Sequence, residues 1–449
     1  MNQLTLFDRL CSLKHLYAAW EKLNKTNRGS FGLSGESIDE FDEQLDVNLE
    51  SLSQQLKTGK YQFSAARPYL IPKPNGKLRP LQIPEIDDRV VLKAMALLLE
   101  RELRMVLLPG EGVSFAYEKG KGIQNALSRI KEHYDQGNRF IYEADIVDFF
   151  GTVSRDRIVE QISEQLPDNS LNELISQGIT PRVGGLQSIA IEYHELFADK
   201  GGIPQGNPLS PLFSNVYLSP FDAMMTKRGF KLVRYADDFV VPAPSEEAAK
   251  AAYECSQTYL KDTLRLDIHP LSAEPGSKTR IVDPTKETFS FLSVSFDGKN
   301  LFPSVKGKDK FIDSLLQLCS DTSEPNVAKL LTKMKNKHDG WISSYLFTDV
   351  QRYFEELDAM INWGLYKYLK NSGWPLSRSS LGKIPKRFRK RGEVEYKSGE
   401  CLSDEQRKSS GIPLSKALYA QRMEKKEEKG EKAKKQGKPD KPAKQKVAA

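Results

Sequence analysis

The chain has 449 residues, of which 39% are hydrophobic and 28% are charged, and its formal net charge is +7. This length can bury two or three domain cores, and the basic excess predicts an anionic partner such as nucleic acid. The four cysteines are widely spaced, and the five histidines show no metal-ligand spacing, which argues against a disulfide framework and a zinc site. We find no signal peptide and no apolar run long enough for a membrane span. These features predict a cytoplasmic protein.

The N-terminal part predicts helices followed by a basic hairpin. Apolar residues recur at helical spacing over 13–20 and 45–56. Residues 69–84 then read as two short strands around a Pro-Asn-Gly turn. Lys73, Lys77 and Arg79 lie at or near this turn, and Arg suits bidentate phosphate contacts. The residues alone leave two interpretations open, a triphosphate-binding hairpin and a solvated one.

A third predicted strand, 139–147, carries an acidic residue near its end. Asp145 is that residue, and Asp148 follows directly after the strand. Ser154 is a good N-cap for a helix with Ile158 and Ile162 on its inner face. Active sites are often assembled at strand ends, so Asp145 is a candidate catalytic carboxylate. Asp148 is interpreted as a turn residue.

An irregular loop precedes the next predicted helix. Residues 201–211 read Gly-Gly-Ile-Pro-Gln-Gly-Asn-Pro-Leu-Ser-Pro, and the helix begins at about Ser210. Glycines in such a turn allow the backbone to approach a ligand closely. The loop is therefore a candidate binding element, of moderate specificity on its own.

Residues 232–241 read as an apolar strand, an acidic tip and a second apolar strand. We expect a hairpin that turns at Ala236 and Asp237, followed by Asp238. Two adjacent carboxylates disfavour each other's ionisation, and burial strengthens this effect. A divalent cation such as Mg²⁺ relieves it, since hard cations prefer carboxylate oxygens. We therefore expect Asp237 and Asp238 to meet Asp145 and to hold two metal ions.

The C-terminal part predicts helices and a basic end. A helix is expected over 246–264, strand-like alternation over 288–296, and further helices over 307–370. Residues 383–391 are rich in Lys and Arg, and from about residue 424 the composition is low-complexity and predicts disorder. The basic run fits either a nucleic-acid backbone or a solvated surface.

Four motifs, taken in order, carry a resemblance to a known family. They are Ile71-Pro72-Lys73…Gly76-Lys77-Leu78-Arg79-Pro80-Leu81…Ile83-Pro84, Asp145-Ile146…Phe149-Phe150, Gly202-Ile203-Pro204-Gln205-Gly206…Leu209-Ser210-Pro211 and Tyr235-Ala236-Asp237-Asp238. Together they resemble a bacterial reverse transcriptase of the group II intron-like kind. Gly151 stands where the intron-encoded enzymes usually have Asp, and Ser293 stands where the Phe-Leu-Gly motif has Gly. No Cys/His nuclease module or clear retron motif is found, so the chain is most similar to stand-alone reverse transcriptases linked to anti-phage defence.

The resemblance implies an α+β fold of the right-hand polymerase type, with fingers, a palm built on an antiparallel sheet, and a helical thumb. The expected parts are N-terminal helices and fingers over 1–135, the palm over 136–305 with a fingers segment at about 155–200, the thumb over 306–375, and a basic C-terminal extension over 376–449, disordered from about 424.

The resemblance also implies a set of site residues. Asp145, Asp237 and Asp238 would be catalytic and would bind two Mg²⁺ ions, or Mn²⁺ in their place, together with the Ile146 carbonyl. The nucleotide would be bound by Lys73 and Arg79 at the triphosphate, Phe150 as a steric gate against the 2′-hydroxyl, Gln205 and Gly206 at the base, and Lys278 near the departing pyrophosphate. The implied partners are an RNA template (a dedicated non-coding RNA is one candidate), dNTPs and a DNA product.

Other functions share parts of this pattern. An RNA-dependent RNA polymerase has the same palm chemistry, but Phe150 and the Ala before the paired aspartates argue against it. A group II intron or retron-type reverse transcriptase, or a maturase-like RNA-binding protein, is the alternative outside defence. A maturase-like protein would have little use for three clustered acids, which are costly to bury. A metal nuclease would not need the Pro-Gln-Gly loop or the basic hairpin.

Overall fold

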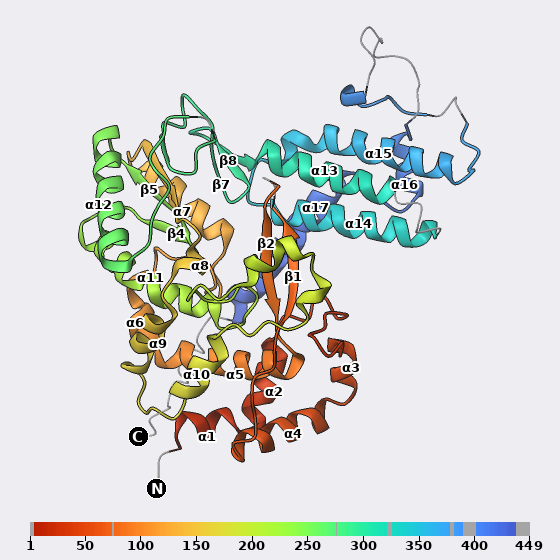
Figure 1. Ribbon diagram of the computed structural model, residues 1–449. Helices are drawn as coiled ribbons and strands as arrows, with labels where there is room; N and C mark the ends of the chain where they lie inside the picture. Colours follow the sequence, from red (N-terminus) through yellow and green to blue (C-terminus); the bar gives the residue numbers. More distant parts are fainter. Residues whose placement is uncertain are drawn as a thin grey trace, which may run out of the picture. The chain divides into compact units, whose positions relative to one another are not determined.

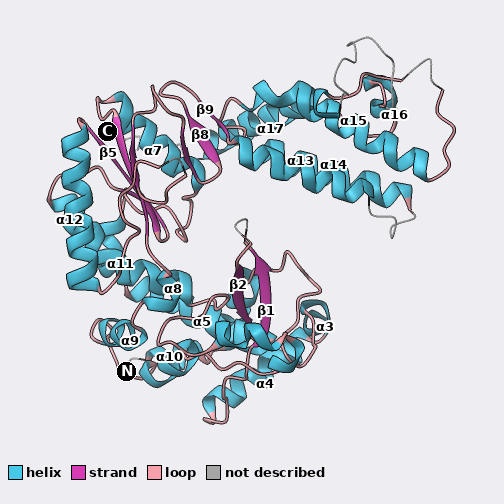
Figure 2. Cartoon of the chain, turned by 45° about the horizontal axis from the view of Figure 1, so that its top comes forward, coloured by secondary structure: helices cyan, strands magenta, loops and turns pink. Residues whose placement is uncertain are grey.

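A computed structural model describes residues 4–73, 76–274, 276–320, 326–377, 381–388 and 401–436. They form a mixed α+β chain that divides into two compact units, Met1–Asp283 and Pro284–Ala449. Figures 1 and 2 show the helices and strands of each unit. Each unit has its own hydrophobic core. Within the described ranges, every helix is too short or too polar to cross a membrane.

The first unit contains two sheets and most of the helices. Its strands are β1 (Arg67–Pro72), β2 (Leu78–Ile83), β3 (Phe140–Asp145), β4 (Val233–Tyr235), β5 (Asp238–Ala243) and β6 (Arg280–Val282). Its helices are α1 (Leu6–Leu10), α2 (Leu13–Lys22), α3 (Ile38–Glu43), α4 (Leu45–Lys57), α5 (Ile86–Glu102), α6 (Arg104–Leu107), α7 (Ile123–Asp135), α8 (Phe149–Thr152), α9 (Arg155–Ser163), α10 (Asn172–Ile179), α11 (Ser210–Lys227) and α12 (Glu246–Leu264), with 3-10 turns η1 (Leu108–Gly110), η2 (Leu186–Ser188) and η3 (Ile191–Phe197).

The larger sheet of this unit is antiparallel and has the strand order β4-β5-β3-β6. Its strands are rich in Val, Ile, Phe and Tyr, which suit a pleated, buried surface. Helix α7 packs against β4 and β5, and α12 packs against β3, β5 and β6. The two helices therefore supply much of the apolar surface that holds the four strands in register.

Local signals explain where the elements around the sheet begin and end. The Ser245 hydroxyl accepts a hydrogen bond from the Ala248 amide and caps α12, which ends where Arg265 adopts a left-handed backbone. The Ser154 hydroxyl caps α9 in the same way, and Ile158 and Ile162 are buried. The predicted helices over 246–264 and after Ser154 are thus confirmed.

The second unit combines a small sheet with helices. Its elements are β7 (Phe289–Phe291), β8 (Val294–Phe296), β9 (Leu301–Pro303), α13 (Val305–Ser320), α14 (Val327–Ser344), η4 (Val350–Tyr353), α15 (Phe354–Asn371), η6 (Lys386–Phe388), α16 (Asp404–Ser409) and α17 (Ser415–Gln436). Strands β7, β8 and β9 pair antiparallel in that order. The division between the units falls between β6 and β7, within the predicted palm range of 136–305.

Two residues of the β7–β8 hairpin turn have left-handed backbones. Leu292 has a φ of 51° and Ser293 a φ of 64°. Glycine adopts such angles at lowest cost, which explains why the related motif has Gly where this chain has Ser293. The turn forms nevertheless, and the Ser293 carbonyl accepts a hydrogen bond from the Ser304 amide at 3.0 Å.

The C-terminal part contains the helices α16 and α17, within the range expected to form a basic extension. Helix α17 extends to Gln436, and its residues 424–436 lie in the range for which the composition predicts disorder. Lys, Glu, Ala and Gln are good helix formers, and Leu418 at the start of α17 is buried in the second core. Residues 437–449, and Arg389, Lys390 and Arg391 of the basic run, lie outside the described residues.

A buried polar network joins four helices of the second unit, α14, α15, α16 and α17. The Arg407 guanidinium donates to the Asp358 carboxylate at 2.7 Å, and the Ser415 hydroxyl donates to the same carboxylate at 2.7 Å. His338 on α14 is fully buried, and its Nε2 lies 3.0 Å from the Ser415 hydroxyl. Burial, and secondarily the Arg407 charge, lowers the pKa of His338 to about 3.

This pKa predicts acid destabilisation of the second unit. Unfolded His binds a proton below about pH 6.5, whereas folded His338 does not until about pH 3. The stabilisation is therefore present above pH 6.5 and is lost as the pH falls, by about 2 kcal/mol at pH 5. Three of the four tryptophans (Trp341, Trp363 and Trp374) belong to this unit, so fluorescence-monitored urea unfolding measures the loss.

The variant His338→Gln is expected to remove most of this pH dependence between pH 7 and pH 5. His194→Gln, in the other unit, is the control and should retain it. An unchanged pH slope in His338→Gln would contradict the assignment to His338.

Candidate active site

The register of the larger sheet brings the predicted acidic residues together. Asp145, the last residue of β3, pairs directly with Asp238, the first residue of β5. Directly paired residues on antiparallel strands have Cβ atoms about 4.5–5.5 Å apart. The β4–β5 hairpin turns at Ala236 and Asp237, as predicted, so Asp237 lies beside this pair. Three carboxylates from two distant parts of the sequence thus meet at one end of the sheet.

The turn itself holds an unusual backbone conformation. Ala236 has a φ of 61°, in the left-handed region that non-glycine residues rarely adopt. Residues held in this way cluster at functional sites, where the surrounding structure compensates for the strain. The conformation places Asp237 at the tip of the hairpin.

Burial, reinforced by neighbouring negative charges, raises the pKa values of Asp237, Asp238 and Glu143. Burial raises the pKa of Asp238 to about 8, reinforced by the charges of Asp237, Asp145 and Glu143. Burial, and then the Asp145 charge, also raises the pKa of Asp237, against the opposing effects of Arg79 and Lys278. Glu143 lies two residues before Asp145 on the same face of β3, and burial raises its pKa to about 7 despite the Arg280 guanidinium 3.1 Å away. The site therefore concentrates negative charge that is incompletely compensated.

Two cationic or titratable side chains flank Asp145. The Lys278 ammonium donates a short hydrogen bond to Asp145 Oδ2, and His269 Nε2 lies 3.8 Å from the same oxygen. His269 also lies 3.3 Å from the Lys278 ammonium. Ile146 and Ile268 form an isolated β-bridge. In this bridge the Val147 amide donates to the Asp267 carbonyl and the His269 amide donates to the Asp145 carbonyl. The Ile146 carbonyl therefore takes no part in the bridge.

The donor chemistry of this cluster fits a hard divalent cation. Carboxylate and backbone carbonyl oxygens are the ligands that Mg²⁺ prefers. A cation would offset both the burial cost and the repulsion that raise the Asp237 and Asp238 pKa values. In the described part of the chain, however, no three Asp, Glu, His or Cys side chains are close enough to form a complete ion site. Lys278 occupies one Asp145 oxygen, so a cation would have to compete with it.

Three of the predicted nucleotide-binding residues line one cavity of about 190 Å³. They are Lys73, Phe150 and Gln205. The remaining lining residues come mainly from β2, the start of α8 and the loop before α11; they are Leu78, Pro80, Gln82, Asp148, Gly151, Pro181, Leu196, Ala198, Asp199, Lys200, Gly202, Ile203 and Pro204. Asp148 has a left-handed backbone with φ of 44°, and a Cβ at Gly151 would lie only 2.4 Å from its carboxylate. Gly151 thus makes room for the Asp148 side chain.

Arg79 and Lys278 belong to the acidic cluster instead of this cavity. Both interact electrostatically with Asp237, and neither lines the cavity that contains Lys73. The predicted triphosphate contacts, Lys73 and Arg79, are thus divided between the cavity and the acidic end of the sheet.

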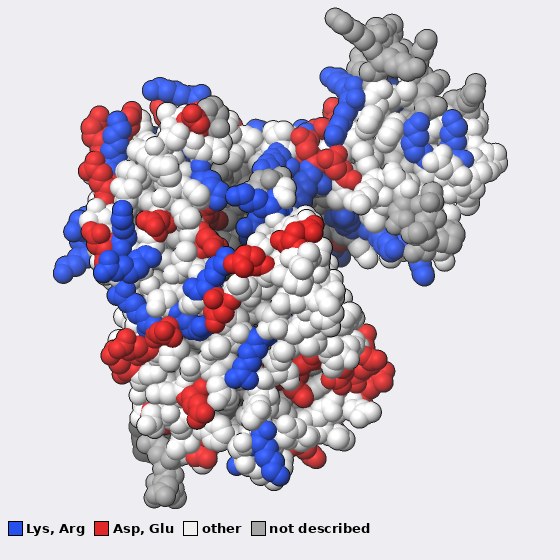
Figure 3. Space-filling view, in the orientation of Figure 1, with Lys and Arg blue, Asp and Glu red and all other residues white. Residues whose placement is uncertain are grey.

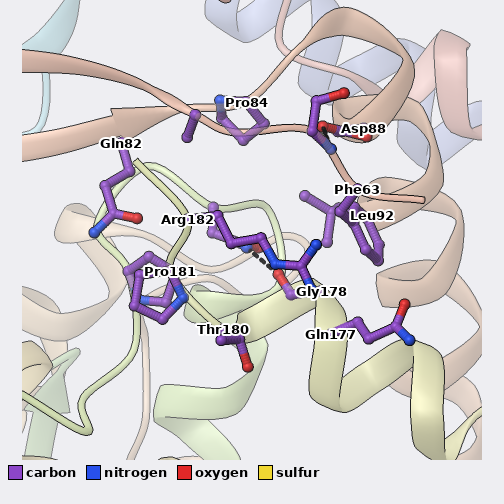
Figure 4. A pocket seen from close by; sticks show the side chains of 14 residues that line it. Phe63, Gln82, Pro84, Asp88, Leu92, Gln177, Gly178, Thr180, Pro181 and Arg182 are labelled. Atoms are coloured by element: carbon purple, nitrogen blue, oxygen red, sulfur yellow. Dashed lines mark hydrogen bonds between the residues drawn. The ribbon is translucent and has the colours of Figure 1, made fainter. Parts of the chain in front are cut away.

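Gly206 is required by close packing of its loop on β2. It has a φ of 104°, and a Cβ there would lie 2.5 Å from the Gln82 carbonyl oxygen. The Gln82 amide donates to the Gln205 carbonyl at 2.8 Å, which extends the attachment. Behind the loop, the Asn207 amide group donates to the Gly178 carbonyl at 2.6 Å, next to a small cavity that Gln82 and Asp88 also line (Figure 4). The loop is therefore fixed from both sides.

Sequence reasoning missed three residues of the site. Glu143 could have been found from the two-residue period of its strand, which puts it on the same face as Asp145. His269 had no signal, because it reaches Asp145 through long-range pairing. Tyr117 is half-exposed and has a left-handed backbone with a φ of 63°. Its pKa is raised, mainly by the burial of its hydroxyl group and then by the charges of Asp237 and Tyr235.

Comparison with known proteins identifies the family. The profile of the reverse transcriptase (RNA-dependent DNA polymerase) family matches residues 71–296, half of the chain. The chain belongs to the reverse transcriptase family. The matched range includes the acidic cluster, the basic hairpin and the Pro-Gln-Gly loop.

Individual relatives are distant. Protein YkfC of Escherichia coli K12 is 28% identical over 226 residues, which cover 49% of this chain and 57% of YkfC. Group II intron-encoded protein LtrA of Lactococcus lactis subsp. cremoris is 28% identical over 229 residues, which cover 50% of this chain and 36% of LtrA. The chain thus spans less than two thirds of each relative. A solved telomerase structure from Candida albicans aligns at a TM-score of 0.42 and 13% identity over 75% of this chain and 62% of that chain.

The acidic cluster predicts the effect of neutralising Asp237. Asp237→Asn keeps the shape of the side chain but removes the charge that a cation needs, so nucleotide incorporation should fall by about a thousandfold or more. Unfolding stability should not decrease, because the charged form of Asp237 is disfavoured in the folded state. Primer extension and urea unfolding measure the two quantities. Asp135→Asn, on the exposed face of α7, is the control.

Proposed function

We propose that this chain is an RNA-directed DNA polymerase that synthesises cDNA on an RNA template by metal-dependent phosphoryl transfer. The observation that carries this proposal is the direct pairing of Asp145 with Asp238 beside the Asp237 turn, within the range matched by the reverse transcriptase family. Phosphoryl transfer needs positioning and charge stabilisation more than covalent chemistry. A cluster of carboxylates at the end of a rigid sheet suits that requirement.

The acidic residues would hold two Mg²⁺ ions. Asp145, Asp237 and Asp238 would supply carboxylate ligands, and the Ile146 carbonyl would supply a further oxygen. Bound ions would activate the primer 3′-hydroxyl and neutralise the leaving pyrophosphate. The register of β3 and β5 keeps the carboxylates in place. Lys278 is proposed to donate a proton from Nζ to the leaving pyrophosphate.

The surrounding basic and polar residues would bind the incoming nucleotide. Arg79 acts from the acidic side and Lys73 from the cavity side, so that the triphosphate is held between them. Gln205 lines the cavity and Gly206 keeps its loop close to β2, which supports a role for the loop at the base pair being formed. Phe150 shares the cavity with Gln205 and is proposed to contact the sugar.

We assign the parts of a right-hand polymerase on the same basis. The fingers comprise residues 1–135 and a segment at about 155–200, the palm is built on the sheet of β3–β6, and the thumb comprises the helices α13–α15. Exposed lysines on α14 (Lys329, Lys333 and Lys335) would contact the nucleic-acid backbone, and Figure 3 shows Lys and Arg side chains along the visible face of the second unit.

The proposal predicts the effect of removing the Phe150 ring. A ring below the sugar leaves no room for a 2′-hydroxyl, so Phe150→Ala should raise the use of rNTPs relative to dNTPs by roughly ten- to a hundredfold. Single-nucleotide incorporation with dNTPs and rNTPs measures the ratio of kcat/KM values. Phe140→Ala, at the far end of β3, is the control for general loss of packing. An unchanged ratio in Phe150→Ala would reject the steric role.

Primer extension by the wild-type chain tests the activity itself. With Mg²⁺, dNTPs and a primed RNA template, we expect extension to the template end, which EDTA abolishes. Extension with rNTPs alone would favour an RNA polymerase, and tight RNA binding without extension would favour a maturase-like protein. Cleavage of the template without extension would favour a nuclease.

Two cellular roles share this activity. The sequence favours anti-phage defence, and the intron-encoded relative LtrA favours a role beside an intron RNA. We propose defence as the first role to test, with phage plating on cells that express the wild type or Asp237→Asn. Sequencing the RNA and cDNA that co-purify with the chain separates the roles, since an intron role predicts enrichment of one structured intron RNA.

A further inference from the structure

A buried ion pair lies directly behind the acidic turn. Arg234 on β4 is 1% exposed, and Asp222 on α11 is 0% exposed. The Arg234 Nε donates to Asp222 Oδ1 at 2.7 Å, and Nη2 donates to Oδ2 at 2.5 Å. This two-point contact uses one edge of the guanidinium and fixes the plane of the group.

The remaining guanidinium nitrogen reaches the turn itself. Arg234 Nη1 donates to the Ala236 carbonyl at 2.9 Å and to Asn215 Oδ1 at 3.0 Å. The Ala236 carbonyl belongs to the peptide bond that links the left-handed Ala236 to Asp237. Arg234 therefore holds the Ala236–Asp237 peptide, and the orientation of this peptide determines the position of the Asp237 side chain.

The backbone of Arg234 is anchored as well. Its amide donates to the Val113 carbonyl at 2.7 Å, and its carbonyl accepts from the Phe115 amide at 3.0 Å. The same segment continues to Ala116, whose carbonyl accepts a hydrogen bond from Asn215 at 3.0 Å. The 113–116 segment, α11 and the acidic turn thus meet at Arg234.

We propose that Arg234, locked by Asp222, is a positioning residue for the Asp237 carboxylate. The inference rests on the proposed polymerase function for its kinetic consequence, but the positioning of the turn can be measured separately. Arg234 would not touch the substrate. It would act through the Ala236–Asp237 peptide, which it keeps in a conformation that this sequence does not favour on its own.

A purely stabilising role does not account for the arrangement. A buried ion pair contributes little net stability, and a well-packed apolar pair of similar volume often replaces it without loss. Lysine would keep the positive charge, but its single nitrogen lacks the planar fork that joins a carboxylate edge to a backbone carbonyl. The guanidinium is needed specifically for the contact with Ala236.

The test compares Arg234→Met/Asp222→Leu and Arg234→Lys with the wild type. The double variant removes both charges, leaves neither one unpaired, and keeps apolar volume in the core. Arg234→Lys is the second variant if the double variant is poorly folded. Arg407→Lys alters the ion pair of another fully buried arginine, with the partly exposed Asp358 in the second unit, and is the control for the loss of such a pair. The measurements are amide hydrogen exchange of 233–239 and steady-state primer extension.

We expect exchange over 233–239 to be at least about tenfold faster in both Arg234 variants and unchanged in Arg407→Lys. The kcat should fall roughly ten- to a hundredfold, while the KM for dNTP changes less than about threefold, because the turn positions a reacting group and not the nucleotide. Wild-type exchange and wild-type kcat in an active double variant would overturn the positioning role. If the wild type is inactive but exchange still quickens, the proposed function fails and the positioning of the turn stands.

Discussion

The pairing of β3 with β5 is the constraint on which the site depends. Asp145 and Asp238 face each other only in the observed register, and a slip of one residue would turn one of them to the opposite face of the sheet. The buried side chains of both strands, such as Tyr142 and Phe239, whose ring centroids lie 5.8 Å apart, therefore fix the site as well as the core. The chemistry is positioned by the same packing that stabilises the first unit.

The cost of this arrangement is electrostatic. Burial raises the pKa values of Glu143 and Asp238 to about 7 and about 8, and Asp237 is shifted in the same direction. Lys278 and Arg79 offset part of the negative charge, and the Arg234–Asp222 pair holds the turn without adding net charge. A site with this balance gains from a bound cation, which relates the fold to magnesium-dependent chemistry.

The sequence predicted the local features of this site and missed those made by long-range contacts. The hairpin at Ala236, the strand carrying Asp145 and the cap at Ser154 follow from composition and spacing, so they could be read directly. The division of Lys73 and Arg79 between the cavity and the acidic cluster depends on how β1 and β2 pack on the loop before α11. No local pattern encodes that packing. Helix α17 was not predicted, because its start is anchored by contacts with other helices, as the burial of Leu418 in the second core shows.

The most direct test of the account is a crystal structure of the chain with a primed RNA template, a non-hydrolysable dNTP and Mn²⁺, with the ions located by anomalous scattering. The account predicts two anomalous peaks within ligand distance of the Asp145 and Asp237 carboxylates, and Lys278 displaced from Asp145. An ordered primer end and nucleotide with no peak near these two carboxylates would contradict it.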